Sequence, residues 1–498
     1  MSLNPLVFPI DITVAAPSPS DKTADTDRLA DGLKKHGLDR VQIPLHIMRK
    51  LPEELRKKDF QVKLAVGLSE EGYTLFDLGR ERIYGIALDI GSTNIECSLF
   101  DLSTGEKIGA AETENPQLSF GSDVLTRVQR SMMGGYSALQ KALAMGVNQA
   151  VEEVCKRNGV SGEDVLAVTV AGNTIMSHFF LGLDVKNIPL SPYVPAVNRA
   201  VFAGAEEMAL SVNKNAVVYV FPNSGSYVGG DIISGMLFTG VHRADEPVLF
   251  IDVGTNVEIT LGCRDWIMVG AGAAGPALEG GVASIGKKAE TGTISEVTID
   301  SLSKKIKMGV IGDTEPRGIC GSGLISLVSE MYSAGIIDQA GRFTGTGNGI
   351  IEKDGVKAYL LHRSGSRELY LTENEIKNFL LSKAAMFSFL YVFVRSVGLT
   401  FRDIKKVYVA GALGCGINPE KAITIGMLPD IARERFIPVG NSSLGGAEML
   451  LLNRDLVREV KDIASRITYR EMNEDADLMQ VLQGAMFIPH TEPEILKG

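Results

Sequence analysis

Short apolar runs separated by polar turns extend through most of the chain, and segments with a helical apolar period fill the intervals between them. In residues 1–82 this pattern predicts a small α/β domain with two helices and three strands. The strands are expected at residues 6–14, 61–66 and 73–78, and the helices at residues 25–35 and 43–57. Nothing in this domain has the pattern of a catalytic site.

From residue 83 onward the chain contains an internal duplication. The segment 88–96, Leu-Asp-Ile-Gly-Ser-Thr-Asn-Ile-Glu, recurs at 251–258 as Ile-Asp-Val-Gly-Thr-Asn-Val-Glu, with one residue deleted. In each copy one strand enters the turn, a second leaves it, and a third follows a polar turn. The strands are expected at 84–88, 95–100 and 107–111, and again at 248–251, 257–261 and 266–270. Two β-meanders at equivalent places predict two similar lobes.

Helices are expected in much of the remainder. Thr372 and Glu375 have the spacing of a capping box, which opens a long apolar helix expected to end near Gly398. Two shorter helices are expected at residues 322–334 and 418–426. The resulting domain boundaries are 1–82 for the small α/β domain, 83–245 for the first lobe, and 246–498 for the second lobe with the C-terminal helices.

Composition narrows the classes of function. The chain has 498 residues, 45% of them hydrophobic and 22% charged, which is enough apolar surface for two or three domains with their own cores. A net charge of -10 argues against binding to nucleic acid or to an anionic membrane surface, since both attract excess Lys and Arg. The apolar run 384–394 is shorter than the roughly 20 residues of a membrane span. The N-terminus lacks the pattern of a secretory signal.

The five cysteines lie far apart in the sequence, at Cys97, Cys155, Cys263, Cys320 and Cys415. No pair has the spacing of a zinc site, an iron–sulfur site or a disulfide framework. A reducing, cytoplasmic setting fits this pattern best.

The duplicated turns have the chemistry of a nucleotide site. Asp89 and Asp252 each follow a buried strand and precede a tight turn of Gly, Ser or Thr, and Asn. Backbone N–H groups and hydroxyls in such a turn can face phosphate oxygens, while the carboxylate holds hydrated magnesium. One turn alone also fits an ordinary hairpin. Two copies favour a triphosphate bound from two sides.

Two further glycine turns suit the remainder of a nucleotide. Residues 409–414 follow a strand at 406–409, and small residues there let a flat ring approach the backbone. Residues 318–323 open a helix whose N-terminal amides could face the nucleotide or a phosphate. The alternative for the second turn is a plain strand-to-helix connection.

The segments 89–94, 252–256 and 409–414 resemble, in order and character, the two phosphate motifs and the adenosine motif of the actin, sugar kinase and heat-shock ATPase superfamily. The resemblance extends from residue 83 to the C-terminus. It implies an α/β fold of two duplicated ribonuclease-H-like lobes, preceded by a small α/β linker domain. It also implies ATP and Mg²⁺ as ligands.

Further segments resemble one branch of that superfamily, the ATP-dependent reductive activators of corrinoid proteins. They are 115–117, 121–127, 172–178, 229–231, 275–280, 318–323 and 410–414. Such activators use ATP hydrolysis to help an electron convert Co(II) to Co(I) in a corrinoid protein of a methyltransferase system. The resemblance therefore implies a corrinoid protein as partner, together with an electron donor, which is a ferredoxin-like domain or protein. The oligomeric state stays open, a homodimer included.

The resemblance assigns roles to individual residues. Asp89 and Asp252 are expected to hold magnesium and water, and Glu258 is a candidate for polarising the attacking water, its alternative being a structural strand residue. His178 fits a core histidine better than a catalyst. The phosphate-binding residues are expected to be Gly91, Ser92, Thr93, Asn94, Gly254, Thr255 and Asn256, and the nucleotide-binding residues Gly321, Ser322, Gly411, Ala412 and Gly414.

Members of the resembling family carry an iron–sulfur cluster, yet the cysteines of this chain cannot ligate one. Either a cluster-bearing domain has been removed from a longer protein, or a separate protein supplies electrons. The start Met-Ser-Leu, directly before a linker-like segment, favours removal. Two other functions fit the same fold: a small-molecule kinase, and an ATP-switched chaperone or scaffold.

Overall fold

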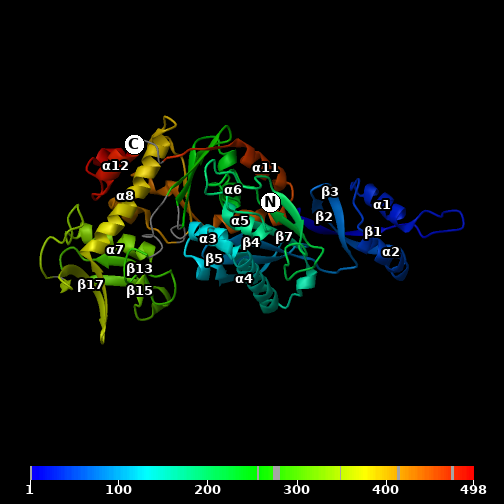
Figure 1. Cartoon of the computed structure of the whole chain (residues 1–498), viewed down its shortest axis with the longest axis horizontal. Coiled ribbons are helices and arrows are strands. Elements are labelled where there is room, and N and C mark those ends of the chain that lie inside the picture. Colours follow the sequence, from blue (N-terminus) through cyan, green and yellow to red (C-terminus); the bar gives the residue numbers. More distant parts are fainter. Residues whose placement is uncertain are drawn as a thin grey trace. The chain divides into compact units, whose positions relative to one another are not determined.

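The structure is a computed structural model that describes residues 3–254, 257–272, 281–347, 349–411, 416–472 and 476–497 (Figure 1). The chain divides into two units. Unit 1 contains Met1–Phe238 and Ser443–Arg466, and unit 2 contains Thr239–Ser442 and Ile467–Gly498. Residues 443–466 therefore lie in unit 1 although they follow most of unit 2 in the sequence.

Unit 1 begins with a three-stranded antiparallel sheet covered by two helices. The sheet has the order β1-β2-β3. Its strands are β1 (Val7–Thr13), β2 (Gln61–Ser69) and β3 (Gly72–Leu78), and its helices are α1 (Asp25–Lys35) and α2 (Leu45–Lys57). Leu29, Leu33 and Leu51 on the helices are fully buried with the strands in one apolar core. All five elements predicted for this segment are confirmed.

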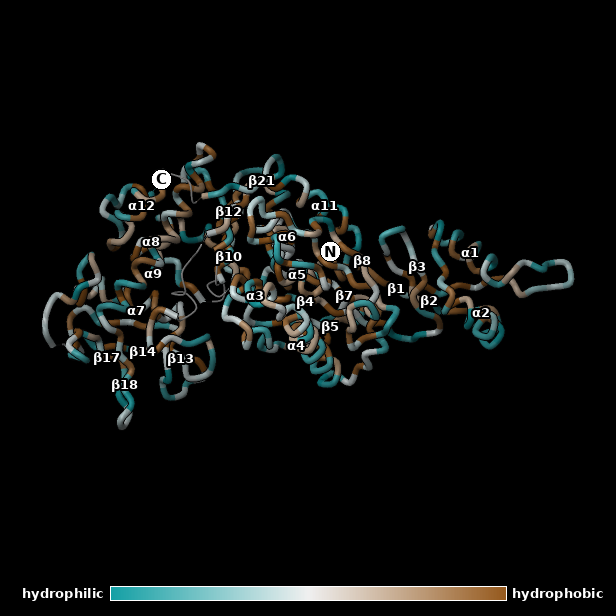
Figure 2. The backbone as a smooth tube through the Cα atoms, viewed as in Figure 1, coloured by the Kyte–Doolittle hydropathy of each residue, from teal (hydrophilic) through white to brown (hydrophobic). Residues whose placement is uncertain are grey.

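A six-stranded sheet forms the centre of unit 1, in the order β6-β5-β4-β7-β9-β8. Its strands are β4 (Tyr84–Ile90), β5 (Asn94–Asp101), β6 (Lys107–Glu114), β7 (Val165–Gly172), β8 (Val201–Gly204) and β9 (Val217–Val220). The central strands β4 and β7 run parallel, and Asp89 is the one residue of this pair that is not buried. Figure 2 shows apolar, brown stretches along these central strands.

The helices of unit 1 include two from the segment after residue 442. They are α3 (Val124–Arg130), the π-helical turn η2 (Ser131–Gly135), α4 (Tyr136–Arg157), α5 (Thr174–Leu181), α6 (Gly230–Thr239), α10 (Ser442–Leu452) and α11 (Leu456–Arg466). α4 packs closely on β5, because a Cβ on Gly146 would lie 2.9 Å from the Ile95 side chain. α10 is joined to β7 by a hydrogen bond from the Thr169 hydroxyl to the Ala447 carbonyl.

The main sheet of unit 2 has the order β20-β19-β10-β11-β12-β21. Its strands are β10 (Val248–Val253), β11 (Val257–Gly262), β12 (Ile267–Gly272), β19 (Val407–Gly411), β20 (Phe436–Gly440) and β21 (Ile467–Tyr469). β10 pairs antiparallel with β11 and parallel with β19, as β4 pairs with β5 and β7 in unit 1. The duplication predicted from the two turns is therefore confirmed, and the fold is that of two ribonuclease-H-like lobes.

Two small sheets and several helices complete unit 2. The sheets have the orders β14-β13-β15 and β16-β17-β18. Their strands are β13 (Thr293–Ile299), β14 (Ile306–Val310), β15 (Gly318–Ile319), β16 (Ile350–Lys353), β17 (Val356–Ser364) and β18 (Arg367–Thr372). The helices are α7 (Gly321–Ser333), α8 (Glu373–Arg395), α9 (Pro419–Thr424) and α12 (Ala476–Ala485).

α8 is the longest helix of unit 2. The predicted capping box is confirmed, since Thr372 and Glu375 exchange hydrogen bonds between side chains and backbone. The helix ends at Arg395, three residues before Gly398. By length and composition alone α8 could cross a membrane, yet 72% of its most apolar window is buried inside the protein. It is a core helix that carries Phe387 and Phe393 into the interior of unit 2.

Candidate functional site

The first duplicated turn lies at the carboxyl end of β4. Asp89 is the second-last residue of that strand and stands directly opposite Glu96 in the β4–β5 ladder. The turn itself, Gly91 to Thr93, is partly exposed. A Cβ on Gly91 would lie 2.6 Å from the Asn94 carbonyl oxygen, so only glycine fits there. Backbone N–H groups of such a turn are available to an anionic ligand.

Asn115, the residue directly after β6, supports this turn through hydrogen bonds. Its buried amide donates a hydrogen bond to the Gly91 carbonyl at 2.9 Å, and its backbone N–H donates to the Thr93 carbonyl at 2.7 Å. Asn94, expected to bind phosphate, donates through Nδ2 to Glu112 at 2.6 Å. The geometry therefore gives Asn115 a positioning role and ties Asn94 to the neighbouring strand.

A serine from the far end of the sequence reaches the first carboxylate. The hydroxyl of Ser443, at the start of α10, donates to Oδ1 of Asp89 at 2.8 Å. The Ser443 carbonyl in turn accepts a hydrogen bond from the hydroxyl of Ser234 on α6 at 2.6 Å. Sequence reasoning missed both serines, because neither lies in a motif and their contact spans most of the chain.

A second carboxylate belongs to this edge of unit 1. Asp231 is the second residue of α6 and lies about one turn before Ser234, and burial raises the pKa of its carboxyl to about 6. Gly229 leaves no room for a side chain, because a Cβ there would lie 2.7 Å from Oδ1 of Asp231 and 2.4 Å from the Cα of Asn173. A carboxyl group with a pKa near neutrality is suited to general acid–base work. The sequence signal was the segment 229–231, which carried no assigned role.

The strands on either side of the second duplicated turn pair in unit 2 as those of the first turn do in unit 1. Asp252 is the second-last residue of β10, and Glu258 stands directly opposite it on β11. Asp252, Gly254 and Glu258 are partly exposed. Thr255 and Asn256, both expected to bind phosphate, lie outside the described residues.

Each turn thus places two acidic residues on one face of its sheet. Direct cross-strand partners have Cβ atoms roughly 5 Å apart, and like charges in that relation destabilise a sheet. A bound cation offsets that repulsion, so the pairs Asp89–Glu96 and Asp252–Glu258 fit a hydrated Mg²⁺, which needs only one or two protein carboxylates. Within the described residues no group of three or more His, Cys, Asp or Glu is placed to hold a metal ion. Glu96 is the counterpart of Glu258 that sequence reasoning did not single out.

The third predicted turn begins beside the second carboxylate. Gly411 ends β19, which runs parallel to β10, and it has a φ of +73°. A Cβ on Gly411 would lie 2.3 Å from the Val253 carbonyl oxygen and 2.6 Å from Oδ1 of Asp252. The close approach of the two strands therefore requires glycine. Ala412 and Gly414, expected to bind the nucleotide, lie outside the described residues.

The fourth turn opens α7. Gly321 is buried and Ser322 is partly exposed, and the N-cap residue Cys320 makes no side-chain cap hydrogen bond within the described part of the chain. Ser322 lies next to the segment that follows the third turn, since a Cβ on Gly416 would be 3.4 Å from the Ser322 hydroxyl. A Cβ on Gly323 would meet the Ile294 carbonyl at 2.2 Å, so the turn is tight. Gly416, which follows the third turn in the sequence, is therefore a neighbour of the fourth turn within unit 2.

Other candidate side chains have structural roles. His178 is fully buried, and one ring nitrogen bonds the Thr174 carbonyl at 2.7 Å while the other accepts from the N–H of Ala196 at 3.1 Å. Burial lowers its pKa, which keeps the ring neutral. The four described cysteines are free and buried. Cys415 lies outside the described residues.

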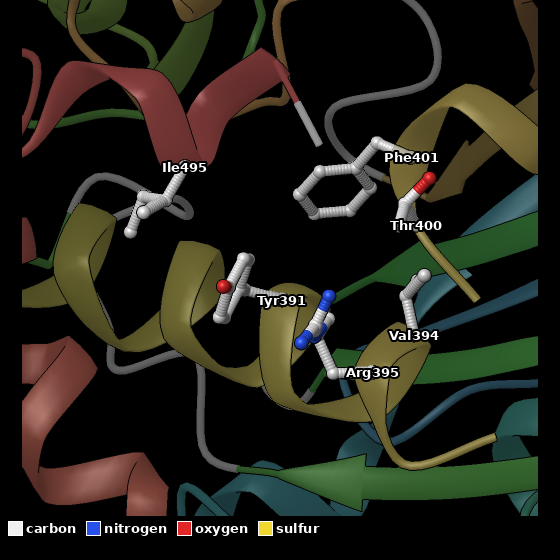
Figure 3. Close-up of a pocket in the computed structure, with 6 residues that line it drawn as sticks. All are labelled: Tyr391, Val394, Arg395, Thr400, Phe401 and Ile495. Atoms are coloured by element: carbon white, nitrogen blue, oxygen red, sulfur yellow. The ribbon is translucent and has the colours of Figure 1, made fainter. Parts of the chain in front are cut away.

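Two cavities lie against the C-terminal part of α8. One has a volume of about 40 Å³ and is lined by Tyr391, Arg395, Phe401 and their neighbours (Figure 3). The other is an open hollow of about 830 Å³ between α8 and the segment around α12. Neither is lined by a residue predicted for the nucleotide site.

Three protein-family models match the chain in succession. The model described as the RACo linker region matches residues 1–84, and that of the RACo middle region matches residues 84–244. The C-terminal domain of RACo, described as the ASKHA domain, matches residues 246–497.

Characterised relatives and a solved structure agree with these matches. The chain is 28% identical over 426 residues to the corrinoid activation enzyme RamQ of Eubacterium limosum, covering 81% of this chain and 70% of that protein. It is 25% identical over 416 residues to the Co(II) methylated amine-specific corrinoid protein reductase of Methanosarcina barkeri, covering 78% and 73%. A solved structure of a reductive activator for a corrinoid, iron–sulfur protein superposes with a TM-score of 0.92 and 36% identity, covering 99% of this chain and 81% of that one.

Proposed function

Because this chain belongs to the RACo family, with matches from residue 1 to residue 497, we propose that it is an ATPase that drives the reductive activation of a corrinoid protein. The observation that carries the proposal is the repeated Asp–Glu turn at the carboxyl end of a central parallel strand, once in each unit. The named relatives act on corrinoid proteins, which supports the partner class.

ATP and Mg²⁺ fit the residues of the two turns. Asp89 and Asp252 would hold hydrated magnesium, and the turn residues beside them would donate to phosphate oxygens. Gly411 and the N-terminus of α7 would approach the nucleoside. Magnesium bound there would neutralise the charge that develops on the phosphate oxygens during hydrolysis.

Asp231 is assigned to accept the proton of the attacking water. Its carboxyl has a pKa of about 6, so it is ionised at neutral pH and is a better base than an ordinary aspartate. Two hydrogen bonds connect its helix, α6, to Asp89. Ser234 on α6 donates to the Ser443 carbonyl, and the Ser443 hydroxyl donates to the Asp89 carboxylate. Glu258, the candidate from the sequence, would instead help Asp252 to position magnesium and water.

The electron and the nucleotide have separate tasks. One electron from a low-potential donor converts Co(II) to Co(I), and hydrolysis of ATP to ADP and phosphate transfers none. ATP contributes by binding two conformations of the activator–partner complex with different affinity, which favours the conformation whose cobalt is more easily reduced. Co(I) chemistry and free thiols both require a reducing environment, so we expect this protein in the cytoplasm.

The test is hydrolysis of ATP by the purified chain, alone and with a Co(II) corrinoid protein, while the corrinoid absorbance is followed under a strong chemical reductant. Stimulated phosphate release together with Co(I) formation is expected. Asp252→Asn should lose both signals and keep the fold. Full activation of the corrinoid protein by Asp252→Asn would contradict the role given to Asp252. A rate of hydrolysis that no corrinoid protein changes would contradict the proposed partner.

A further inference from the structure

Two loops of unit 1 meet at an exposed pair of aromatic rings. The ring centroids of Tyr193 and Tyr227 lie 5.7 Å apart with an interplanar angle of 51°. Tyr193 is 38% exposed and Tyr227 41%, and the neighbouring Leu190 and Val194 are 51% and 58% exposed. These four residues are called the tyrosine patch below.

Hydrogen bonds hold the two loops together beneath the rings. The Ser226 hydroxyl donates to the Tyr193 carbonyl at 2.5 Å, and the N–H of Gly225 donates to Oδ1 of Asn198 at 3.1 Å. His178 anchors the first loop to α5, because its ring nitrogen accepts from the N–H of Ala196. The apolar rings are therefore exposed on a supported surface, which lowers the entropy that binding would cost.

Neither loop carries a charge. Residues 187–198 and 221–230 contain no Asp, Glu, Lys, Arg or His. The centre of a protein–protein interface is depleted in charge and enriched in tyrosine, and tyrosine is among the residue types enriched at the few positions that dominate its binding energy. The tyrosine patch has that composition, and it lacks the Lys and Arg side chains that attract nucleic acid.

The second loop leads directly into the nucleotide edge of unit 1. Tyr227 precedes Asp231 by four residues. The Gly225 carbonyl accepts a hydrogen bond from the Thr174 hydroxyl at 3.1 Å, at the start of α5. Gly229 packs against Asn173 with no space for a side chain. A short, closely packed segment therefore joins Tyr227 to Asp231.

We propose that the tyrosine patch is the surface on which the corrinoid protein docks. We propose also that docking changes the position of the Asp231 side chain through residues 227–231. The inference rests on the proposed function. A partner whose activation is coupled to hydrolysis has to alter the nucleotide site, and this patch is joined to that site by one loop. The contact is apolar, so the affinity is expected to change little between low and physiological salt.

The test compares wild-type chain with the double variant Tyr193→Ala, Tyr227→Ala. The dissociation constant for a Co(II) corrinoid protein is expected to rise about 30-fold or more, which corresponds to the loss of an interface hot spot. Stimulation of hydrolysis at a fixed partner concentration should be lost, while hydrolysis without the partner stays at the wild-type rate.

Two controls separate docking from folding. The double variant Tyr193→Phe, Tyr227→Phe keeps both rings and should bind within a few-fold of wild type. Met145→Ala removes a side chain that is 70% exposed on α4 and should leave binding unchanged. Unfolding temperatures of all variants are measured alongside.

The outcomes distinguish the two proposals. If the wild-type chain binds and is stimulated, and the alanine pair behaves identically, the patch is not the docking surface although the proposed function stands. If the wild-type chain neither binds the corrinoid protein nor is stimulated by it, the proposed function fails. If the alanine pair changes the chain's own molar mass by light scattering but not its binding to the corrinoid protein, the patch joins two copies, which overturns the inference.

Discussion

The Ser443 hydroxyl donates a hydrogen bond to the Asp89 carboxylate at 2.8 Å, across 354 residues of sequence. Asp89 is the second-last residue of the first central strand of unit 1, whereas Ser443 lies in the first turn of a helix that follows nearly all of unit 2 in the sequence. The carboxylate expected to hold magnesium is thus oriented by a residue from the other end of the chain.

Removal of that hydrogen bond should weaken catalysis. Ser443→Ala removes the hydrogen bond from the Ser443 hydroxyl to the Asp89 carboxylate, and a hydrogen bond to a charged group contributes about 1.5 to 3 kcal/mol. We expect kcat/KM for ATP to fall about tenfold or more. Ser442→Ala is the matched control, because the Ser442 hydroxyl is buried and has no hydrogen-bond partner among the residues that the structure describes. Equal losses in both variants would contradict the role given to Ser443.

Asp231 should control the pH dependence of hydrolysis. Its raised pKa of about 6 means that the carboxylate is protonated, and inactive as a base, below that pH. We expect the wild-type kcat to fall about tenfold per pH unit below pH 6, and Asp231→Asn to lower kcat roughly 100-fold or more with little change in KM. The control is Asp184→Asn, an exposed acidic residue after α5. A wild-type pH profile retained in Asp231→Asn would exclude Asp231 as the base.

A substitution at Gly411 should disturb the close approach of β19 to β10. Gly411→Ala combines a positive φ with a Cβ that would lie 2.3 Å from the Val253 carbonyl, so the Asp252 turn has to shift. Gly398→Ala has a φ of +76° but no atom within 4 Å of the added Cβ. The backbone conformation costs about 1 to 2 kcal/mol in both. We expect loss of ATP binding by calorimetry in Gly411→Ala alone, and normal binding in both variants would remove the nucleoside role of this turn.

Lys383 should stabilise the C-terminal part of unit 2. This fully buried ammonium on α8 donates to the carbonyls of Ala485, Phe487 and Pro489, the last at 2.8 Å. Lys383→Met leaves three buried acceptors without their donor and should cost about 3 kcal/mol or more. Urea unfolding checks this, with Lys377→Met as the exposed control on the same helix.

Burial lowers the pKa of Lys383 to about 7, and this gives the stability a pH dependence. Between that pH and the ordinary lysine pKa near 10.4, the unfolded chain binds a proton that the folded chain does not. The wild-type free energy of unfolding should therefore rise, relative to Lys383→Met, as the pH is raised from 7 towards 10. A constant difference between the two proteins would show that Lys383 keeps an ordinary pKa when folded.

The strands of both lobes could be predicted because their signals are local. An apolar run that ends in Asp and a glycine turn needs no distant residue to be recognised, and the second copy at Asp252 made the first one at Asp89 specific. The capping box at Thr372 and Glu375 is local in the same sense, since a hydrogen bond between backbone and side chain forms within one helical turn.

The residues around those turns could not be predicted, because their roles depend on neighbours from other elements. Asp231 appeared only as part of a glycine-rich segment, and the burial that raises its pKa arises only in the folded protein. The equivalence of Glu96 and Glu258 could be recognised only from the strand register, which places each glutamate directly opposite an aspartate.

The sequence by itself determined the duplicated lobes, the two acidic turns and the resemblance to corrinoid activators, because periodicity and turn chemistry are written in consecutive residues. Only the tertiary structure decided that Ser443 reaches Asp89, that Gly411 lies against Asp252, and that Tyr193 and Tyr227 share one exposed surface. Those relationships depend on strand register and on helices packed across hundreds of residues. A shift of a few ångströms in the strand register or in the helix packing would remove these contacts, and the local sequence patterns would stay the same.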